Sequence, residues 1–275
     1  MSEVEIPTSG GHLIGTLHLP QTSAEPVPGV ILLHGFTSDR DESPIFGCGD
    51  TLFARTSRAL VAAGFPVLRF DFRGHGASRF VPFEEIDLPP LIDDALASVD
   101  YLMRRPGVSG ECLLVGQSMG GLVAACTAHR DARIRAVALW NAPSNPLRVL
   151  QSALGAGSIG AAFVDGVVEF PWDRKGTFRL KRRFFESLIE ISVLDEVARF
   201  PGRLLVIAGR HDELIQPQPA MAEAFLRVHR GDQRLVMMET DHTFNTTKGQ
   251  TEPVDAAIRE TIAWFEAGDS VPASG

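Results

Sequence analysis

The sequence predicts an α/β fold, in which a mainly parallel sheet of eight strands is flanked by helices. Short apolar runs alternate with segments whose apolar residues share one helical face, and this alternation is typical of βαβ units. Several apolar runs are continuous, as expected for strands that are covered on both faces. The chain has 275 residues, a length that single α/β domains often reach. We therefore expect one domain over residues 1–275.

The predicted strands follow the apolar runs in chain order. Residues 3–6 and 13–19 flank the glycine-rich turn 9–11, so we expect an antiparallel hairpin at one edge of the sheet. The other strands are buried runs bounded by turn residues. They cover residues 29–33, 67–70, 113–115, 137–140, 204–208 and 235–238.

Helices are predicted between these strands. Asp50 is a candidate cap for a helix that ends at Gly64, because the apolar and small side chains from Leu52 to Ala63 share one face. The next helix covers residues 88–103, with two prolines near its first turn, where proline is tolerated. Further helices cover residues 119–129, 219–228 and 254–265.

The stretch Gly116-Gln117-Ser118-Met119-Gly120 lies between a predicted strand and a predicted helix. That order is typical of a nucleophile elbow, a sharp turn that presents a serine hydroxyl above the sheet. Side chains at the flanking positions would collide in such a turn, and glycines avoid those collisions. The pattern is too short to be specific by itself. The prediction that Ser118 is a nucleophile therefore depends on the position of the pattern between a strand and a helix, and on the residues that follow downstream.

A serine nucleophile needs a base that takes its proton and a carboxylate that orients the base. In folds with this elbow, the acid and then the histidine follow the serine along the chain. Asp212 comes just after the strand 204–208, and His242 comes just after the strand 235–238. Ligand sites in open α/β sheets lie at the carboxyl ends of strands, so we expect Ser118, Asp212 and His242 to form a catalytic triad.

Other residues compete for these roles. Asp212 precedes a predicted helix, where an aspartate often serves only as a cap. We favour His242 as the base because it follows the last predicted strand. The rival acids are Asp195, Glu213 and Asp241, and the rival bases are His211 and His229.

The tetrahedral oxyanion of acyl transfer needs hydrogen-bond donors. The backbone N–H of Met119, directly after the nucleophile, is one expected donor, and the loop after the strand 29–33 should supply the other. In that loop, the sequence His34-Gly35-Phe36 makes the Phe36 N–H the second expected donor. We interpret His34 and His75 as residues that hold the shape of their loops.

The strand–helix alternation stops over residues 143–197, which we interpret as an insertion that forms a lid over Ser118. Trp172, Phe184 and Leu188 are the candidate substrate-binding residues, with Ile191 beside them, although each suits packing of the lid onto the body equally well. The part after Trp172 is expected to be helical and is basic. Its basic residues suit a solvated helix face, or alternatively a surface that attracts acidic substrates; they are Arg174, Lys175, Arg179, Lys181, Arg182 and Arg183.

Charge and composition argue against several classes of partner. The formal net charge of −8 disfavours nucleic acid. No apolar run approaches the ~20 residues that span a bilayer, and the acidic start lacks signal-peptide features, so we expect a cytoplasmic protein with no membrane partner. Cys48, Cys112 and Cys126 lack metal-ligand spacing and are expected to be reduced thiols. No metal or organic cofactor is implied, and the sequence neither indicates nor excludes a homo-oligomer.

Five segments together resemble the α/β-hydrolase superfamily over nearly the whole chain. They are residues 34–36, 71–78, 116–121, 209–212 and 241–242. His34-Gly35-Phe36-Thr37 with a modest insertion is further similar to small bacterial carboxylesterases of the cinnamoyl (feruloyl) esterase type, and to serine-aminopeptidase-like hydrolases. Gln117 stands where many of these relatives have histidine.

The resemblance implies a serine hydrolase that cleaves small carboxylic esters through an acyl-enzyme, with aryl or hydroxycinnamoyl esters as candidate substrates. The same triad would serve a serine aminopeptidase or an acyl thioesterase. Lid carboxylates that bind a free amino terminus would mark the peptidase, and the candidates are Glu169, Glu186 and Glu190. A non-catalytic binding protein on this fold is the remaining alternative, although such a protein would normally lack a triad member.

Overall fold

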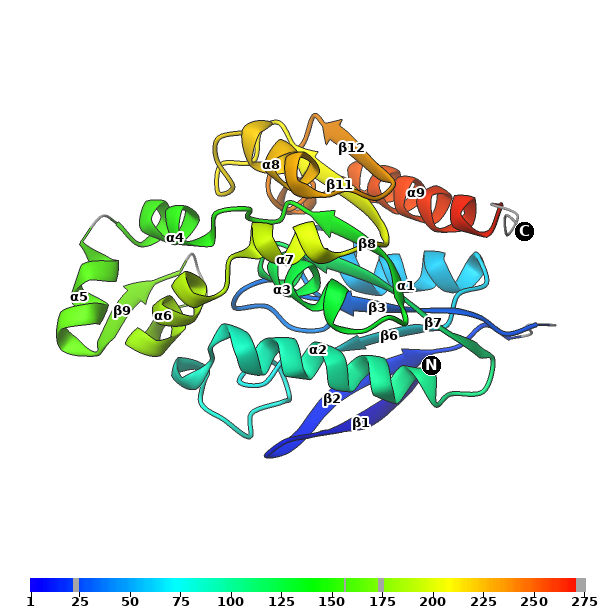
Figure 1. Ribbon diagram of the computed structural model, residues 1–275, viewed down its shortest axis with the longest axis horizontal. Helices are drawn as coiled ribbons and strands as arrows, with labels where there is room; N and C mark the ends of the chain where they lie inside the picture. Colours follow the sequence, from blue (N-terminus) through cyan, green and yellow to red (C-terminus); the bar gives the residue numbers. More distant parts are fainter. Residues whose placement is uncertain (22–24, 156, 173–175, 271–275) are drawn as a thin grey trace.

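An eight-stranded sheet runs through the centre of the molecule, in a computed structural model that describes residues 1–21, 25–155, 157–172 and 176–270 (Figure 1). The strand order is β1-β2-β6-β3-β7-β8-β11-β12. The bounds are β1 Ser2–Thr8, β2 Gly11–His18, β3 Val27–Leu33, β6 Val67–Phe70, β7 Val108–Gln117, β8 Ile134–Trp140, β11 Arg203–Gly209 and β12 Gln233–Met238. β2 pairs antiparallel with β1 and β6, and the pairs from β6 to β12 are parallel. The predicted fold class and edge hairpin are confirmed.

Helices cover both faces of this sheet (Figure 1). On one face α1 (Leu52–Ala62) packs against α9 (Glu252–Glu266), and the other face carries α2 (Leu88–Met103), α3 (Met119–Thr127), α7 (Val193–Arg199) and α8 (Ala220–Val228). Successive strand residues point to opposite faces. Leu32 and Val115 therefore belong to the core beneath α1 and α9, whereas Leu33 and Leu114 belong to the core beneath α2 and α3.

The cap of α1 differs from the predicted one. Thr51, not Asp50, occupies the N-cap position, and its Oγ1 accepts the Ala54 N–H at 3.2 Å. Asp50 pairs instead with Arg58, whose Nη2 lies 2.5 Å from Asp50 Oδ2. Both residue types cap helices well, so the sequence alone could not choose between two adjacent candidates.

The chain between β8 and β11 forms the insertion at the left of Figure 1. Its elements are α4 (Pro146–Leu154), α5 (Ser158–Asp165), β9 (Val167–Pro171), β10 (Thr177–Lys181) and α6 (Arg182–Glu190), followed by α7. β9 and β10 pair antiparallel, and β10 lies where helix was expected. Phe178 and Leu180 alternate with polar residues, a period that suits a strand. α7 packs against α3 and α8, in the helix layer of the body.

The remaining elements are short. β4 (Pro44–Ile45) pairs antiparallel with β5 (Asp50–Thr51). The single-turn 3-10 helices are η1 (Phe83–Glu85), η2 (Ala128–Arg130), η4 (Thr246–Lys248) and η5 (Ala267–Ser270).

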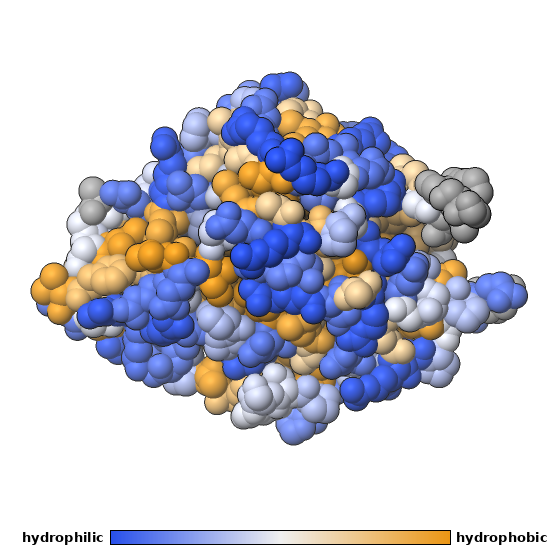
Figure 2. Space-filling view, viewed as in Figure 1, coloured by the Kyte–Doolittle hydropathy of each residue, from blue (hydrophilic) through white to orange (hydrophobic). Residues whose placement is uncertain are grey.

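The outer end of the insertion exposes apolar side chains (left in Figure 2). Val164 on α5 is 84% exposed and Ile189 on α6 is 59% exposed. Within the described part of the chain, no single helix is long and apolar enough to cross a bilayer, although α4 and α5 pass that test when taken together as a bent pair.

Candidate active site

Ser118 lies at the sharp turn between β7 and α3. Its backbone angles are φ 54° and ψ −118°, a strained conformation for a residue with a side chain. The turn requires glycine on either side of it: a Cβ on Gly116 would lie 2.2 Å from the carbonyl oxygen of Gly120, and a Cβ on Gly120 would lie 1.9 Å from that of Leu33. This geometry is that of a nucleophile elbow.

The three residues expected to form a triad lie within hydrogen-bonding distance of one another, just past the ends of β7, β11 and β12. His242 Nε2 is 3.0 Å from Ser118 Oγ, and His242 Nδ1 is 2.8 Å from Asp212 Oδ2. Ser118 is 8% exposed and Asp212 is fully buried. A neutral imidazole in this position donates from Nδ1 to the carboxylate and accepts the hydroxyl proton at Nε2.

The second oxygen of Asp212 is held by the backbone. Leu214 and Ile215 donate their N–H groups to Asp212 Oδ1 at 2.9 and 2.8 Å. Asp212 does not cap α8, whose N-cap is Pro219. One carboxylate oxygen therefore fixes the turn 212–215, and the other is directed at the imidazole.

Asn141 and Gln117 fix the loop that carries His242. Asn141 Nδ2 donates to the His242 carbonyl at 2.9 Å, and Asn141 Oδ1 accepts the Gly209 N–H at 2.8 Å. Gln117 Nε2 donates to the same His242 carbonyl at 3.2 Å. The loops after β8, β11 and β12 are thereby joined through one buried amide.

The surroundings of His242 raise its pKa above the ordinary value of 6.5. Burial has the largest single effect and lowers the pKa. The hydrogen bond and charge of Asp212, with smaller contributions from the charges of Glu42 and Glu213, together outweigh it. The site therefore favours the imidazolium that a general base becomes during acyl transfer.

The rival acids and bases take other positions. His211 Nε2 lies 2.9 Å from an oxygen of Glu239, and His229 Nε2 lies 3.1 Å from the Gly202 carbonyl. Among the described residues, the His242 ring has no hydrogen bond to any of the rival acids, which are Asp195, Glu213 and Asp241.

Both expected oxyanion donors border Ser118. Within the described residues, neither the Phe36 N–H nor the Met119 N–H is hydrogen-bonded to another protein group, and both residues line a cavity that also contains Ser118. His34 has the structural contacts expected of it, because its Nε2 accepts the Phe72 N–H at 3.0 Å. His75 Nδ1 lies 2.9 Å from the Arg73 carbonyl, within its own turn.

Two cavities meet at Ser118. One is an apolar slot of about 50 Å³, and the candidate substrate-binding residues Trp172, Phe184 and Leu188 all line it, whereas Ile191 does not. The other is a pocket of about 210 Å³ with more polar walls. Its polar side chains are those of Glu42, Ser43, Gln117, Ser118, His242, Thr243 and Thr247.

Phe36 connects the site to the insertion. Its ring packs against Trp172 and Phe184 of the insertion at centroid distances of 5.1 and 6.0 Å, and against Phe170 at 6.3 Å. On the body it contacts Phe83 at 5.4 Å. The residue whose backbone N–H is the second expected oxyanion donor is therefore surrounded by aromatic rings, most of which belong to the insertion.

The basic residues of the insertion are matched by carboxylates. Arg179 pairs with Glu84 at 3.2 Å, and Lys181 pairs with Glu85. The two arginines that begin α6 pair with the peptidase-candidate carboxylates Glu186 and Glu190 of the same helix. None of these residues lines either cavity at Ser118, and neither does the exposed Glu169. Arg174 and Lys175 lie outside the described residues.

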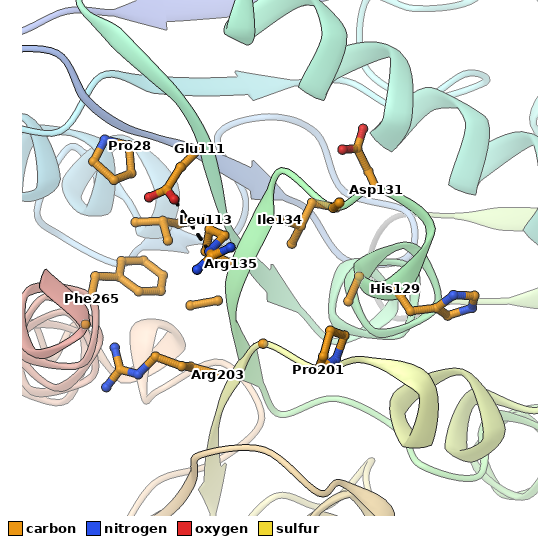
Figure 3. Close-up of a pocket in the computed structure, with 15 residues that line it drawn as sticks. Pro28, Glu111, Leu113, His129, Asp131, Ile134, Arg135, Pro201, Arg203 and Phe265 are labelled. Carbon is orange, nitrogen blue, oxygen red and sulfur yellow. Dashed lines mark ion pairs between the residues drawn. The ribbon is translucent and has the colours of Figure 1, made fainter. Parts of the chain in front are cut away.

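A separate cavity of about 780 Å³ lies at the amino-terminal ends of β7, β8 and β11 (Figure 3). Its charged side chains include Arg135, whose Nε lies 3.5 Å from Glu111, and Arg203, which pairs with Asp232 at 3.0 Å. No triad residue lines it. Across the described chain, no group of three or more His, Cys, Asp or Glu side chains has a geometry that could hold a metal ion.

Two buried residues of the site were not identified from the sequence. Asn141 directly follows β8, so it carried the same signal as the triad members: a polar residue just past a buried strand. Glu42 lies in an irregular loop eight residues after His34 and carried no comparable signal.

The fold, the elbow and the hydrogen-bonded residues at Ser118 together define the class of α/β hydrolases. A family described as the alpha/beta hydrolase family matches residues 30–266, and the chain belongs to it. The protein is therefore a hydrolase by family.

Individual relatives are distant. The chain is 30% identical over 138 residues to a protein named thiohydrolase aneE from Aspergillus aculeatus, which covers 50% of this chain and 40% of that protein. It is 32% identical over 130 residues to the putative hydrolase YtaP of Bacillus subtilis, covering 42% of this chain and 44% of the relative. The chain thus spans less than half the length of these two relatives.

Solved structures share the fold. Est1E from Butyrivibrio proteoclasticus superposes with a TM-score of 0.75 at 21% identity, covering 97% of this chain and 100% of that one. A second structure of Est1E, described as having ferulic acid bound, superposes with the same TM-score of 0.75 at 22% identity. At these identities the likeness shows the fold alone.

Proposed function

We propose that the protein is a serine hydrolase that cleaves carboxylic esters through an acyl-enzyme, with Ser118, His242 and Asp212 as its triad. The observation that supports this most strongly is the chain of contacts from Ser118 Oγ to His242 Nε2 at 3.0 Å and from His242 Nδ1 to Asp212 at 2.8 Å. The strained serine at the end of β7 adds to it, because strain of this kind concentrates at functional sites.

In the proposed reaction His242 takes the Ser118 proton as the oxygen attacks the ester carbonyl. Asp212 holds the imidazole with Nδ1 protonated and stabilises the imidazolium. The N–H groups of Phe36 and Met119 donate to the oxyanion, each contributing about 2.7–4 kcal/mol of transition-state stabilisation. His242 then protonates the leaving oxygen, and the same histidine activates the water that hydrolyses the acyl-enzyme.

The size and the walls of the apolar slot at Ser118 indicate which acyl groups the enzyme would accept. Its volume of about 50 Å³ accommodates a few atoms, given that one water needs at least about 10–15 Å³ of such space. Its aromatic walls, Phe36, Trp172 and Phe184, suit a flat or short apolar acyl group. Short aliphatic acyl groups fit the slot as it stands. A hydroxycinnamoyl group is larger than the slot and would require it to widen, so aryl and hydroxycinnamoyl esters are included because the walls are aromatic and because one structure of Est1E, which shares the fold, has ferulic acid bound.

Labelling with a fluorophosphonate probe tests the mechanism. We expect one covalent adduct on Ser118, lost in Ser118→Ala. Unlabelled enzyme is then compared on a panel of short aliphatic esters, hydroxycinnamate esters, aminoacyl amides and thioesters. Labelling at another residue, or no ester turnover in the panel, would contradict the proposal.

A thioesterase is the second candidate, because a relative that matches half of this chain is named a thiohydrolase. The triad would serve a thioester equally well. The aminopeptidase has less support, since the carboxylates proposed to bind an amino terminus do not line the cavities at Ser118. The ratio of kcat/KM for matched oxygen esters and thioesters decides between the first two.

A further inference from the structure

We propose that Asn141 is a positioning residue for the proposed reaction, and that its side-chain amide keeps the imidazole of His242 aligned between Ser118 and Asp212. The inference rests on the proposed function and adds a residue that acts on the main chain of the site. Asn141 directly follows β8, which lies between β7 and β11 in the sheet. It is therefore next to the strand that ends at the nucleophile and to the strand that leads to the acid.

Both ends of the Asn141 amide are hydrogen-bonded inside the protein. Nδ2 donates to the His242 carbonyl at 2.9 Å and, at the longer distance of 3.5 Å, to the Asp241 carbonyl. Oδ1 accepts the Gly209 N–H at 2.8 Å, and the residue is fully buried. An amide supplies a donor and an acceptor from two atoms of one short side chain. A carboxylate supplies only acceptors, and a hydroxyl has a single polar atom.

The backbone of Asn141 is fixed as well as its side chain. Its φ of +45° lies in the left-handed region, which asparagine adopts more readily than most residues with a side chain. Its N–H donates to the Ile207 carbonyl of β11 at 2.9 Å. The carbonyl of the preceding Trp140 accepts the Ser118 N–H, also at 2.9 Å. The amide therefore extends from a backbone that is hydrogen-bonded to the elbow on one side and to β11 on the other.

Through these bonds Asn141 relates the acid to the base. Gly209 begins the turn that carries Asp212, since its carbonyl accepts the Asp212 N–H at 3.3 Å. The same amide that accepts the Gly209 N–H holds the main chain of His242. The imidazole contacts of 3.0 Å to Ser118 and 2.8 Å to Asp212 depend on where that main chain lies. A misplacement of about 1 Å at a reacting group can cost about 100-fold in rate.

Gln117 keeps the His242 loop attached when the amide of Asn141 is lost. Its Nε2 donates to the same His242 carbonyl at 3.2 Å, so that carbonyl retains a partner. We therefore expect substitution of Asn141 to misalign the base without unfolding the loop. A purely structural role would instead lower the free energy of unfolding and leave the rate of each folded molecule unchanged.

The principal variant is Asn141→Asp, whose carboxylate still accepts the Gly209 N–H but offers no donor to the His242 carbonyl. We expect kcat on p-nitrophenyl acetate to fall about 100-fold. KM should change by less than about threefold, because Asn141 lines neither cavity at Ser118. Rates are taken on the alkaline plateau of each pH profile, where the imidazole is neutral, and are divided by the number of sites that fluorophosphonate labels to completion.

Asn141→Gly is the second variant, because glycine keeps the left-handed backbone and removes the amide. It should lose kcat in the same way. Thr261→Val is the matched control: Thr261 Oγ1 accepts from Nε1 of Trp140, the neighbour of Asn141, at 3.1 Å, and both residues are buried. The control should lower Tm and keep kcat within about twofold of wild type. A loss of kcat in Thr261→Val equal to that in the Asn141 variants would overturn the proposal.

The background Asp212→Asn tests whether Asn141 acts through His242. There the imidazole already has the wrong tautomer, so adding Asn141→Asp should cost less than about fivefold more. A further loss of about 100-fold would contradict the proposal. It also fails if both Asn141 variants keep kcat within about threefold of wild type, or if neither folds under conditions where Thr261→Val folds. These outcomes leave the proposed function intact. If wild type neither reacts with fluorophosphonate at Ser118 nor hydrolyses p-nitrophenyl acetate, both proposals fail.

Discussion

Ser118 carries the backbone strain of the elbow and, in the proposed mechanism, its chemistry. Removal of its hydroxyl leaves the backbone and the neighbouring contacts in place. We expect Ser118→Ala to lower kcat on an activated ester by about 10⁴- to 10⁶-fold while Tm changes little. Steady-state hydrolysis and thermal unfolding of the same preparation measure both quantities. A variant that kept most of its rate would exclude Ser118 as the nucleophile.

In the proposed mechanism Asp212 sets the tautomer of His242, through the contact of 2.8 Å between Asp212 Oδ2 and His242 Nδ1. In Asp212→Asn the amide oxygen still accepts the N–H groups of Leu214 and Ile215, which directs the amide NH₂ at His242 Nδ1. The imidazole is then protonated at Nε2 and accepts no proton from Ser118. We expect kcat to fall about 10⁴-fold at neutral pH. The neighbouring Glu213→Gln is the control, and an equal loss in both variants would contradict the assignment.

The pH dependence of kcat/KM reports on His242. Its pKa is raised by Asp212 despite burial, and only the neutral imidazole accepts the serine proton. Activity should therefore be high above the raised pKa and fall as pH decreases through a value above 6.5. A profile of kcat/KM between pH 5 and 9 measures this limb. A midpoint below the ordinary imidazole value would contradict the predicted direction.

At the scale of elements, β3, β7 and α3 pack so closely around the elbow that Gly116 and Gly120 have no room for a side chain. A Cβ on Gly120 would lie 1.9 Å from the backbone of Leu33, so we expect Gly120→Ala to lower the free energy of unfolding by more than about 3 kcal/mol. Gly160 in α5 has open space around its Cβ position, and Gly160→Ala should stabilise by about 0.5–1 kcal/mol. Urea unfolding compares the two, and equal effects would contradict the packing argument.

The sequence predicted the central elements well where burial leaves a strong periodic pattern. The helix 88–103 matches α2, and the six parallel strands all fall on predicted runs. The sequence analysis did not identify β4 and β5, because strands of two residues are too short to show a periodic pattern. It also did not identify the pair β9 and β10. In β10, basic residues concealed the alternation of Phe178 and Leu180 with polar side chains.

The residues of the candidate site differ in the same way: those just past a strand could be predicted from the sequence, and those in an irregular loop could not. Ser118, Asp212 and His242 each directly follow or lie just past a strand of the parallel part of the sheet, so the order of strands and loops predicts that they lie at one edge of it. Glu42 reaches the site by the path of an irregular loop and through a hydrogen bond to Gly35. The course of such a loop depends on contacts distant in sequence, and neither composition nor period encodes it.

At the scale of the whole molecule, we expect aromatic packing to hold the insertion to the body more strongly than ion pairing does. Phe178 of β10 contacts Phe83 at 5.0 Å, whereas Glu84 and Glu85 form partly or fully solvent-exposed pairs with Arg179 and Lys181 of the insertion. We expect Phe178→Ala to cost about 1–2 kcal/mol and to raise KM. The double variant Glu84→Gln/Glu85→Gln should cost less than about 1 kcal/mol. Thermal unfolding and KM values check this, and a larger loss in the double variant would reverse the ranking.

Phe36 belongs to two parts of the molecule at once, with its ring among the aromatic side chains of the insertion and its backbone beside Ser118. Under the proposed mechanism, the packing of the insertion around this ring therefore helps to fix the position of an oxyanion donor. A single phenylalanine would then link the placement of the insertion to the geometry needed for catalysis.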